Sequence, residues 1–443
     1  MADGMPRTIR RGAESRRKVA GSALSTPNFL LLFAAMLVAA AGNTALQSVM
    51  PAIGRAIGIA DFWVAIAYTW SAVLWVALAP YWAERSDHHG RKALALLGIG
   101  GFIVSMVLCG LVLVAGLHGL LSGVMTFVLF ALFRAIYGSL GCATPSATQA
   151  YLASKTRRSA RTAALSALSS SFGLGTIVGP ALAPLFVLPF IGLPGPLFGF
   201  ALIGIAVFVA VAVWLPNDAS GPRKGRGAAM SYPSMASSLT GASVTAATAP
   251  ARQKRLGWRD PRVKPWIIAG VAGGHAQAAT LTCLGFFVID QLQLAPRGAE
   301  QSIAIVMMAG AAATLAAQWG IIPRLSLSPR ALILWGSLIA AVGLVTTVLA
   351  GGLYGLVLSF GITSLGFGFT RPGFTAGASL AVPLAEQGAV AGLITSANGI
   401  SYIAAPALGM AIYGVNRHLP FVVAAFGLLL LILWGRRALL ETA

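Results

Sequence analysis

The segment Pro80-Tyr-Trp-Ala-Glu-Arg-Ser-Asp-His-His-Gly-Arg-Lys92 separates two long apolar runs of the sequence. Residues 62–82 on one side and 93–115 on the other carry no charged side chain. Two carboxylates and three permanent cations therefore fall at a boundary between water and an apolar phase. Gly90 allows the backbone to turn tightly there. We expect a short loop that connects two membrane-spanning helices, with its cations orienting the chain in the membrane.

Apolar stretches as long as a membrane-spanning helix recur through the whole chain. Of the 443 residues, 57% are hydrophobic and 9% are charged, whereas about a quarter of the residues of a soluble domain are charged. A helix needs about 20 apolar residues to cross a bilayer. We therefore predict an all-α membrane protein with twelve transmembrane helices, at approximately residues 28–51, 62–82, 93–115, 121–149, 163–188, 196–216, 265–289, 300–322, 331–351, 354–381, 388–414 and 420–435.

The formal net charge of +20 is distributed unevenly along the chain. Most of the 31 lysines and arginines lie in the N-terminal tail, in alternate loops and in one central segment. This is the positive-inside pattern, so these parts and both termini are expected in the cytoplasm. Attraction to anionic membrane lipids explains the charge better than binding of nucleic acid does. We predict a multi-pass integral protein of a bacterial inner membrane.

The central segment, residues 217–264, is rich in Ser, Ala, Gly, Pro and basic residues and lacks hydrophobic periodicity. This composition is typical of a flexible linker. We expect the linker to lie in the cytoplasm and to divide the chain into two six-helix bundles. The predicted parts are a basic tail (1–27), the bundles 28–216 and 265–435, and a second cytoplasmic tail (436–443).

The two predicted bundles contain matching stretches of sequence in the same order. Residues 89–98 match 327–336, residues 140–145 match 367–372, and Gly179-Pro180 corresponds to Ala405-Pro406. Internal repeats of this kind are typical of secondary transporters, in which two bundles move about a binding site near the membrane midplane.

Three short motifs fall at the ends or inside the predicted helices. They comprise Asp87, Gly90, Arg91 and Lys92 in the opening segment; Arg134, Tyr137, Gly138 and Gly141 within residues 121–149; and Gly175, Gly179 and Pro180 within residues 163–188.

These motifs resemble G-x-L-A-D-R-x-G-R-K, R-x-x-Q-G-x-G-A-A and the core of G-x8-G-x3-G-P-x2-G-G of the major facilitator superfamily, and within it the drug:proton antiporter branch. The chain departs from the family pattern in placing Ala83, Arg85 and His88 in the first motif and Tyr137 at the glutamine position of the second. The resemblance implies an alternating-access exporter, or efflux transporter, that moves a small drug-like or metabolite substrate in exchange for protons.

The resemblance also suggests what each motif does. The segment with Glu84 and Asp87 is expected to act as a latch between the bundles, the alternative being a solvated turn. Arg134 lies in mid-helix far from other charges, and the family implicates this position in proton transfer or its control; satisfaction by backbone carbonyls is the alternative. The helix 163–188 glycines permit close helix approach and Pro180 bends the helix, although tight packing alone also explains these residues.

Further side chains inside the predicted helices are candidates for contact with a substrate. Their alternative role is helix–helix hydrogen bonding or packing or, for Arg371, a position near the cytoplasmic headgroups. They are Asn43, Gln47, Trp70, Gln277, Arg371 and Asn398. The shortage of carboxylates in the apolar runs argues against a strongly cationic substrate. A neutral or weakly anionic compound fits Arg134 and Arg371 better.

A proton antiporter needs a group that titrates within the membrane. None of the 11 acidic residues lies centrally in an apolar run. Asp290, at the end of the helix predicted at 265–289, and His275 inside that helix are the candidates. Coupling through either residue or through the Asp87 segment stays open, as do uniport and coupling to another ion.

The sequence lacks the patterns of an enzyme: no nucleophile–histidine–acid set, metal-ligand spacing or phosphate-binding loop occurs. The three cysteines fall in apolar runs and are expected to be buried and reduced. We predict a functional monomer that needs no metal or cofactor, takes its energy from the proton gradient, and has a small-molecule substrate, protons and membrane lipids as partners. The alternatives are a proton-coupled uptake symporter or uniporter and, in another class, a polytopic membrane enzyme or lipid-handling protein.

Replacing Asp87 tests whether the opening segment does more than orient the chain. Asp87→Asn keeps the side-chain size and removes the charge, so we expect transport to slow several-fold while the amount of inserted protein stays the same. The measurement is the transport rate in proteoliposomes, normalised to inserted protein. A wild-type rate would leave the segment with a topological role alone.

Overall fold

The computed structural model describes residues 27–156, 158–217, 257–295, 298–325, 327–383 and 386–439. Residues 1–26 and 218–256, which hold most of the predicted tail and linker, lie outside this part of the chain. Every regular element within it is a helix: α2 (Pro27–Ile57), α3 (Asp61–His89), α4 (Arg91–Leu117), α5 (Gly123–Ile136), η1 (Tyr137–Gly141), α6 (Ala143–Lys155), α7 (Arg158–Leu182), η2 (Ala183–Phe186), α8 (Gly195–Trp214), α10 (Lys264–Leu292), α11 (Ala299–Leu315), η3 (Ala316–Ile321), α12 (Ile322–Leu325), α13 (Pro329–Leu349), α14 (Leu353–Leu380), α15 (Gln387–Val415) and α16 (Leu419–Ala438).

The predicted all-α membrane fold is confirmed. Ten helices of the described part are long and apolar enough to cross a membrane, where α5–η1–α6 counts as one span and α11–η3–α12 as another. The remaining long helices, α7 and α15, are less hydrophobic and pack against α2 and α10. The count of twelve spans stays a prediction. The three cysteines are free and buried.

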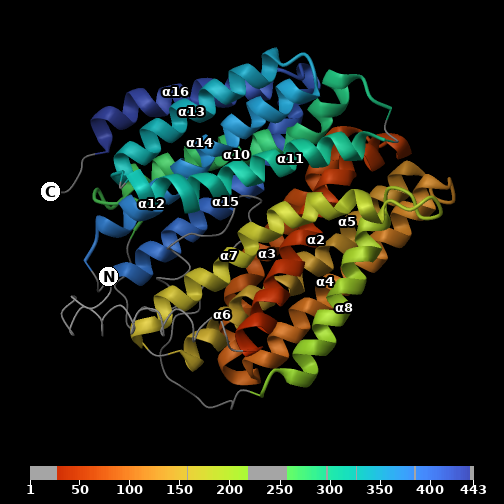
Figure 1. Ribbon diagram of the computed structural model, residues 1–443, viewed down its shortest axis with the longest axis horizontal. Helices are drawn as coiled ribbons and strands as arrows, with labels where there is room; N and C mark the ends of the chain where they lie inside the picture. The colour runs from red at the N-terminus through yellow and green to blue at the C-terminus, as the bar shows by residue number, and fades with distance from the viewer. Residues whose placement is uncertain are drawn as a thin grey trace, which may run out of the picture.

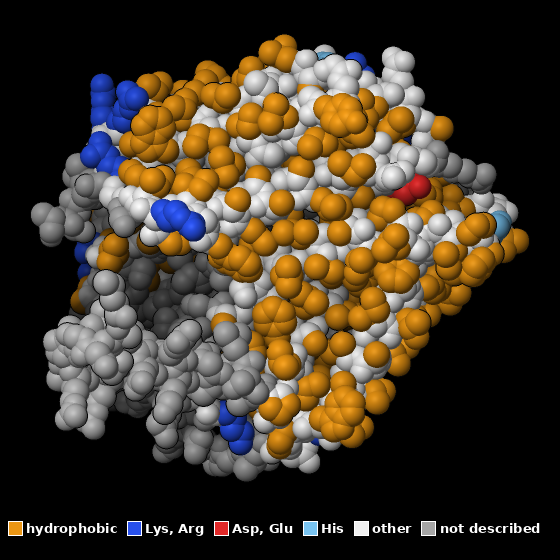
Figure 2. Space-filling model, in the orientation of Figure 1, with side chains coloured by type: hydrophobic (Ala, Val, Ile, Leu, Met, Phe, Trp, Pro, Cys, Tyr) orange, Lys and Arg blue, Asp and Glu red, His pale blue; other side chains and the backbone are white. Residues whose placement is uncertain are grey.

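The helices form two bundles, α2–α8 and α10–α16, which lie side by side and diverge toward one end (Figure 1). The bundles meet where α2 and α7 contact α11, α2 contacts α10, and α3 contacts α15. Most of the Lys and Arg side chains visible in Figure 2 gather at the diverging end, where the surface between the bundles is hollowed. We call this the basic end; its described cations include Lys92, Arg324, Arg330, Arg436 and Arg437.

The segment 80–92 is not the loop that the sequence predicts. Helix α3 continues to His89 and α4 begins at Arg91, so Gly90 alone separates them. Its φ of 89° lies in a region that glycine adopts without strain. A helix can continue beyond the hydrocarbon region of the membrane through charged residues, because water hydrates their side chains there. The side chains of Glu84 and Asp87 are outside those that the structure describes.

Two of the three cations of this segment, Arg91 and Lys92, lie at the start of α4. Lys92 donates from Nζ to the backbone oxygen of Ala212 at 2.7 Å. Ala212 is in the last turn of α8, whose unpaired carbonyl groups attract a cation. Arg91 is buried, at 8% exposure. The segment therefore joins α3, α4 and α8 at the basic end.

Helix α7 packs unusually closely on α2 through its glycines. A Cβ on Gly175 would lie 2.7 Å from the Ala40 Cβ. A Cβ on Gly179 would overlap the Thr44 hydroxyl and the Ala41 backbone oxygen. Thr44 Oγ1 donates to the Gly175 carbonyl at 3.2 Å. The glycines therefore hold the two backbones in contact, and α7 ends at Leu182 soon after Pro180.

Adding a methyl group at this contact should destabilise the bundle. We expect Gly179→Ala to lower the free energy of unfolding by about 1–3 kcal/mol, because the new Cβ meets backbone that cannot move aside. Thermal unfolding of the purified protein measures the effect. Gly427→Ala in α16 is the matched control, since no atom lies within 4 Å of its added Cβ. Equal unfolding temperatures for the two variants would contradict the close contact.

Candidate functional site

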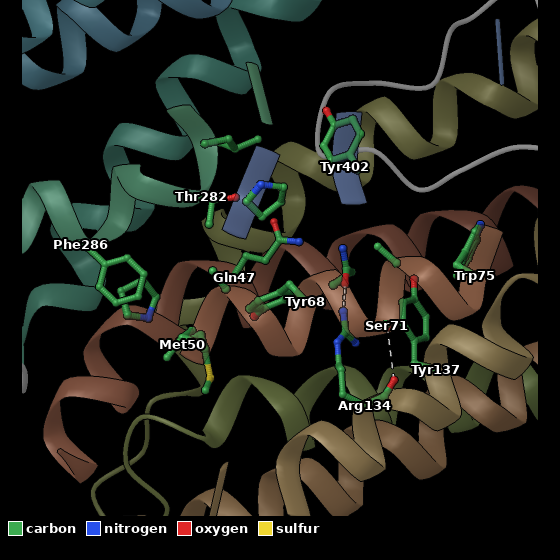
Figure 3. Close-up of a pocket in the computed structure, with 17 residues that line it drawn as sticks. Gln47, Met50, Tyr68, Ser71, Trp75, Arg134, Tyr137, Thr282, Phe286 and Tyr402 are labelled. Carbon is green, nitrogen blue, oxygen red and sulfur yellow. Dashed lines mark hydrogen bonds between the residues drawn. The ribbon is translucent and has the colours of Figure 1, made fainter. Parts of the chain in front are cut away.

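A cavity lies between the two bundles and is lined by both (Figure 3). The space not filled by atoms in and around it is about 750 Å³, part of which is open to solvent. We call it the central cavity. The lining residues come from α2, α3, α5, η1, α10 and α15: Asn43, Gln47, Met50, Pro51, Val64, Ala65, Tyr68, Ser71, Ala72, Trp75, Arg134, Tyr137, Leu281, Thr282, Phe286, Tyr402 and Pro406.

Arg134 supplies the charge of the central cavity. Its side chain is 2% exposed, and Nη2 donates a hydrogen bond to Asn43 Oδ1. The guanidinium carbon lies 4.5 Å from the ring centre of Tyr137 and 5.4 Å from that of Tyr68. Within the described part of the chain, Arg134 forms no ion pair, and its Nε and Nη1 make no hydrogen bond.

The short π-helix η1 sets the position of Tyr137 beneath this guanidinium. Single π-helical turns are frequent at functional sites because they rotate the following side chains. Tyr137 packs against Trp75, with ring centres 5.4 Å apart. The adjacent Gly138 lets η1 approach α3, since a Cβ there would lie 2.5 Å from the Ser71 backbone oxygen. Ser71 Oγ donates to the Arg134 carbonyl at 3.3 Å.

The second bundle contributes hydroxyl groups and a second buried arginine near the central cavity. Thr282, Phe286 and Tyr402 line it from α10 and α15. Arg371 in α14 is 7% exposed, and its guanidinium interacts with the Tyr402 hydroxyl. Arg371 therefore does not line the cavity itself but contacts Tyr402, which does.

At the end opposite the basic end, an ion-pair cluster joins the two bundles. Arg55 near the end of α2 binds Asp290 of α10 through both Nη atoms, and Nη2 also bonds Asp61 at 2.7 Å. Tyr413 of α15 donates its hydroxyl to Asp290, and Arg417 Nη1 donates to the Asp290 backbone oxygen at 2.9 Å. We call Arg55, Asp61, Asp290 and Tyr413 the Arg55 cluster.

The backbones also approach closely beside the Arg55 cluster. A Cβ on Gly285 of α10 would lie 2.5 Å from Pro51 Cγ of α2. The Phe286 ring centre lies 5.5 Å from the Arg55 guanidinium carbon. Next to the cluster, the pKa of His418 is lowered, chiefly by burial and to a lesser extent by the positive charge of Arg417. These contacts close the central cavity at the end where the Arg55 cluster lies.

An exposed ion-pair cluster lies at the basic end, where the chain enters α10. Arg262 bonds Asp260 at 2.7 Å and Glu386, next to the start of α15, at 2.9 Å. The hydrogen bonds from Arg262 lower the pKa of Asp260. The end of the predicted linker is thus tied to the second bundle.

A second cavity, of about 550 Å³, lies between α2, α7, α10, α11 and α14. Its polar lining is uncharged: Thr44, Thr176, Gln277, Thr280, Thr314 and Ser364. Gln277 is the one predicted substrate residue in it. This cavity therefore lacks the charge that distinguishes the central cavity.

The structure brings four of the predicted residues together in the central cavity: Asn43, Gln47, Arg134 and Tyr137. Arg371 lies behind Tyr402, and Asp290 lies in the Arg55 cluster. Asn398 is buried at 8% exposure and lines neither cavity.

Trp70, a candidate for substrate contact or for packing, lines neither cavity. Tyr68, Ser71, Ala72 and Trp75 face the central cavity at helical spacing, so Trp70 falls on another face of α3. Its side chain is 47% exposed, on the apolar surface of the bundle.

His275 makes a local contact. Its Nδ1 lies 2.8 Å from the backbone oxygen of Val271 one turn earlier. A carbonyl oxygen only accepts, so Nδ1 carries a proton in this bond. His275 lines neither cavity.

Sequence reasoning missed Tyr68, Tyr402 and the pairing of Arg55 with Asp290. Tyrosines inside apolar runs are a weak signal, because a buried phenol usually only needs one hydrogen-bond partner. Arg55 and Asp61 flank a turn at Gly58, and this short separation is a local signal for their ion pair. Asp290 is 235 positions from Arg55, so its contact has no local signal.

Two helix bundles with a largely apolar cavity between them, which one buried arginine lines, are the architecture of a membrane transporter. The sequence model of the Major Facilitator Superfamily matches residues 32–406, and the chain belongs to this superfamily. No curated protein sequence matches it.

Two solved structures share the fold. The human organic anion transporter MFSD10 (TETRAN) has a TM-score of 0.63 and 17% sequence identity, over 93% of this chain and 100% of that chain. A bacterial homologue of the iron transporter ferroportin, in an inward-facing state, has a TM-score of 0.66 and 15% identity, over 94% of this chain and 99% of that chain. At these identities the likeness concerns the fold alone.

Neutralising Asp290 should open the end of the central cavity that the Arg55 cluster closes. We expect Asp290→Asn to speed labelling of a cysteine at Thr282→Cys by about tenfold, the effect of removing about 1.4 kcal/mol from the closed state. Labelling uses a membrane-impermeant maleimide applied from that side, in a chain whose native cysteines are alanine.

Asp61→Asn is the matched control for this experiment. Asp61 also pairs with Arg55, but both residues belong to the first bundle, so its loss leaves the link between bundles in place. Equal acceleration by the two variants would show that the Arg55–Asp290 pair does not close the cavity.

Proposed function

We propose that this transporter exports a small drug-like or metabolite compound in exchange for protons. The observation that carries the proposal is the central cavity, which is closed at one end by the Arg55 cluster and has the hollowed basic end on its other side. Alternating access requires such a site between two bundles that can separate at either end. The resemblance of the Gly175–Pro180 motif to the antiporter pattern favours export.

The positive-inside rule assigns the basic end to the cytoplasm. The Arg55 cluster then faces the outside, and the described conformation is the one open to the cytoplasm. We place the protein in a bacterial inner membrane, where protons run inward and can drive export. A cavity formed within one chain is consistent with a functional monomer.

Asp290 is the proposed coupling residue. Among the described residues it is the carboxylate that joins the bundles, and the groups facing it are Arg55, Tyr413 and Arg417, with Asp61 sharing Arg55. Protonation from the outside removes its charge and weakens its bond to Arg55, while Asp61 keeps Arg55 paired. The bundles can then separate on the outer side. His275 and the Asp87 segment are the rival coupling sites.

Proteoliposomes with an imposed pH gradient test the exchange. The probes are ethidium, chloramphenicol and naphthalene-1-sulfonate, which are cationic, neutral and anionic. In vesicles with an acidic lumen, inside-out protein should take up a transported probe while protons leave the lumen. Asp290→Asn should abolish the dependence of uptake on the gradient, and Asp61→Asn should retain it.

The other outcomes discriminate among the mechanisms. Uptake driven by acid on the same side as the probe would indicate symport, as in an importer. Uptake that does not respond to the gradient would indicate a uniporter. Full gradient dependence in Asp290→Asn would move the coupling site to His275 or Asp87.

A further inference from the structure

The central cavity contains a full positive charge that the protein itself does not neutralise. Arg134 is 2% exposed. One of its five N–H groups bonds the uncharged amide of Asn43, and its Nε and Nη1 are left without hydrogen bonds among the described residues. Burying an unpaired charge is costly, so such a group is normally paired, or faces a ligand or a water-filled space.

The groups around this charge are also incompletely bonded. Gln47 Oε1 and the hydroxyl groups of Tyr68 and Tyr137 are buried and make no hydrogen bond within the described chain. All three line the same cavity as Arg134. Buried polar atoms of native proteins are nearly all bonded, so a cluster of unbonded ones at one cavity indicates a place for a polar ligand.

The rest of the lining is apolar and largely aromatic. Tyr68, Trp75, Tyr137 and Phe286 supply flat ring surfaces, and Met50 and Leu281 add aliphatic surface. Among the described residues, no lysine, aspartate or glutamate lines the cavity. A cation would therefore be repelled by Arg134 and would find no carboxylate, whereas an anionic group with two acceptor oxygens matches the guanidinium fork.

We propose that the central cavity binds an organic monoanion, in which a carboxylate or sulfonate group on a flat apolar body binds Arg134. The apolar body lies between the aromatic side chains, and Tyr402 contacts the ligand from the second bundle. A ligand held this way touches both moving parts of the transporter. The inference rests on the proposed function and specifies the substrate class of that same site.

Equilibrium binding to the full-length protein in lipid nanodiscs, at one pH and without a gradient, tests this inference. The probes are two matched pairs: 1-naphthoate with 1-naphthamide, and naphthalene-1-sulfonate with naphthalene-1-sulfonamide. We expect each anion to bind about 10- to 100-fold more tightly than its uncharged partner, as one charge-assisted contact predicts. Equal affinities in both pairs, or no binding of either anion, would overturn the inference.

Variants of Arg134 locate the contact. Arg134→Gln removes the charge but can still donate to Asn43, so anion binding should weaken by about 10- to 100-fold and amide binding should not change. Arg134→Lys keeps the charge without the planar fork and should give an intermediate affinity. Arg330→Gln, at a partly exposed arginine of the basic end, is the control and should bind like the parent protein.

Thermal unfolding of the empty protein separates binding from folding. Because Arg134→Gln removes an unpaired buried charge, the empty variant should unfold at the parent temperature or above. Lower stability combined with unchanged anion affinity would make Arg134 a structural residue and overturn the inference.

The binding test and the test of proton exchange can fail independently of each other. Anion binding through Arg134 without gradient-driven flux would contradict the proposed exchange alone. Gradient-driven flux with a preference for the amides or for ethidium would contradict the anion site alone.

Discussion

The hydrocarbon region of a membrane offers no water to a charged group, so each buried cation must find its partner within the protein or in a ligand. Three cations of this chain meet that constraint differently. Lys92 uses the free carbonyl of Ala212 at the end of α8. Arg55 uses two carboxylates, one from each bundle. Arg134 has an amide and two aromatic rings, and these leave its charge unneutralised. The closed end and the proposed binding site of the transporter follow from this difference.

Most of the fold could be predicted from the sequence because apolar length alone specifies a membrane helix. The predicted spans agree with the observed helices to within several residues at most ends. The Pro80–Lys92 segment was predicted wrongly, because charge density identifies the edge of the membrane but not the end of a helix. The π-helix η1 also has no simple sequence signal, although Gly138 and Gly141 show in retrospect where α3 and Tyr137 approach closely.

The site was only partly predictable. Asn43, Gln47, Arg134 and Tyr137 are polar residues in apolar runs, and the cost of burying them pointed to a shared cavity. The sequence left Trp70 between substrate contact and packing, because an aromatic residue suits a lipid-facing surface as well as a cavity, and only helix phase separates the two. The Arg55–Asp290 contact depends on how the bundles pack, which no local pattern encodes.

With the proposed anion site, the unneutralised charge of Arg134 would also make the transport cycle electrical. When a monoanion occupies the site, the cavity carries no net charge as the bundles reorient; when the site is empty, it carries one positive charge. Moving one full charge through a membrane potential of 100 mV changes the free energy by about 2.3 kcal/mol. With the cytoplasm negative, the field draws the empty site inward, toward the conformation that is hollowed at the basic end. The cell's voltage would thus reset the carrier after each release, separately from any force that the proton gradient supplies.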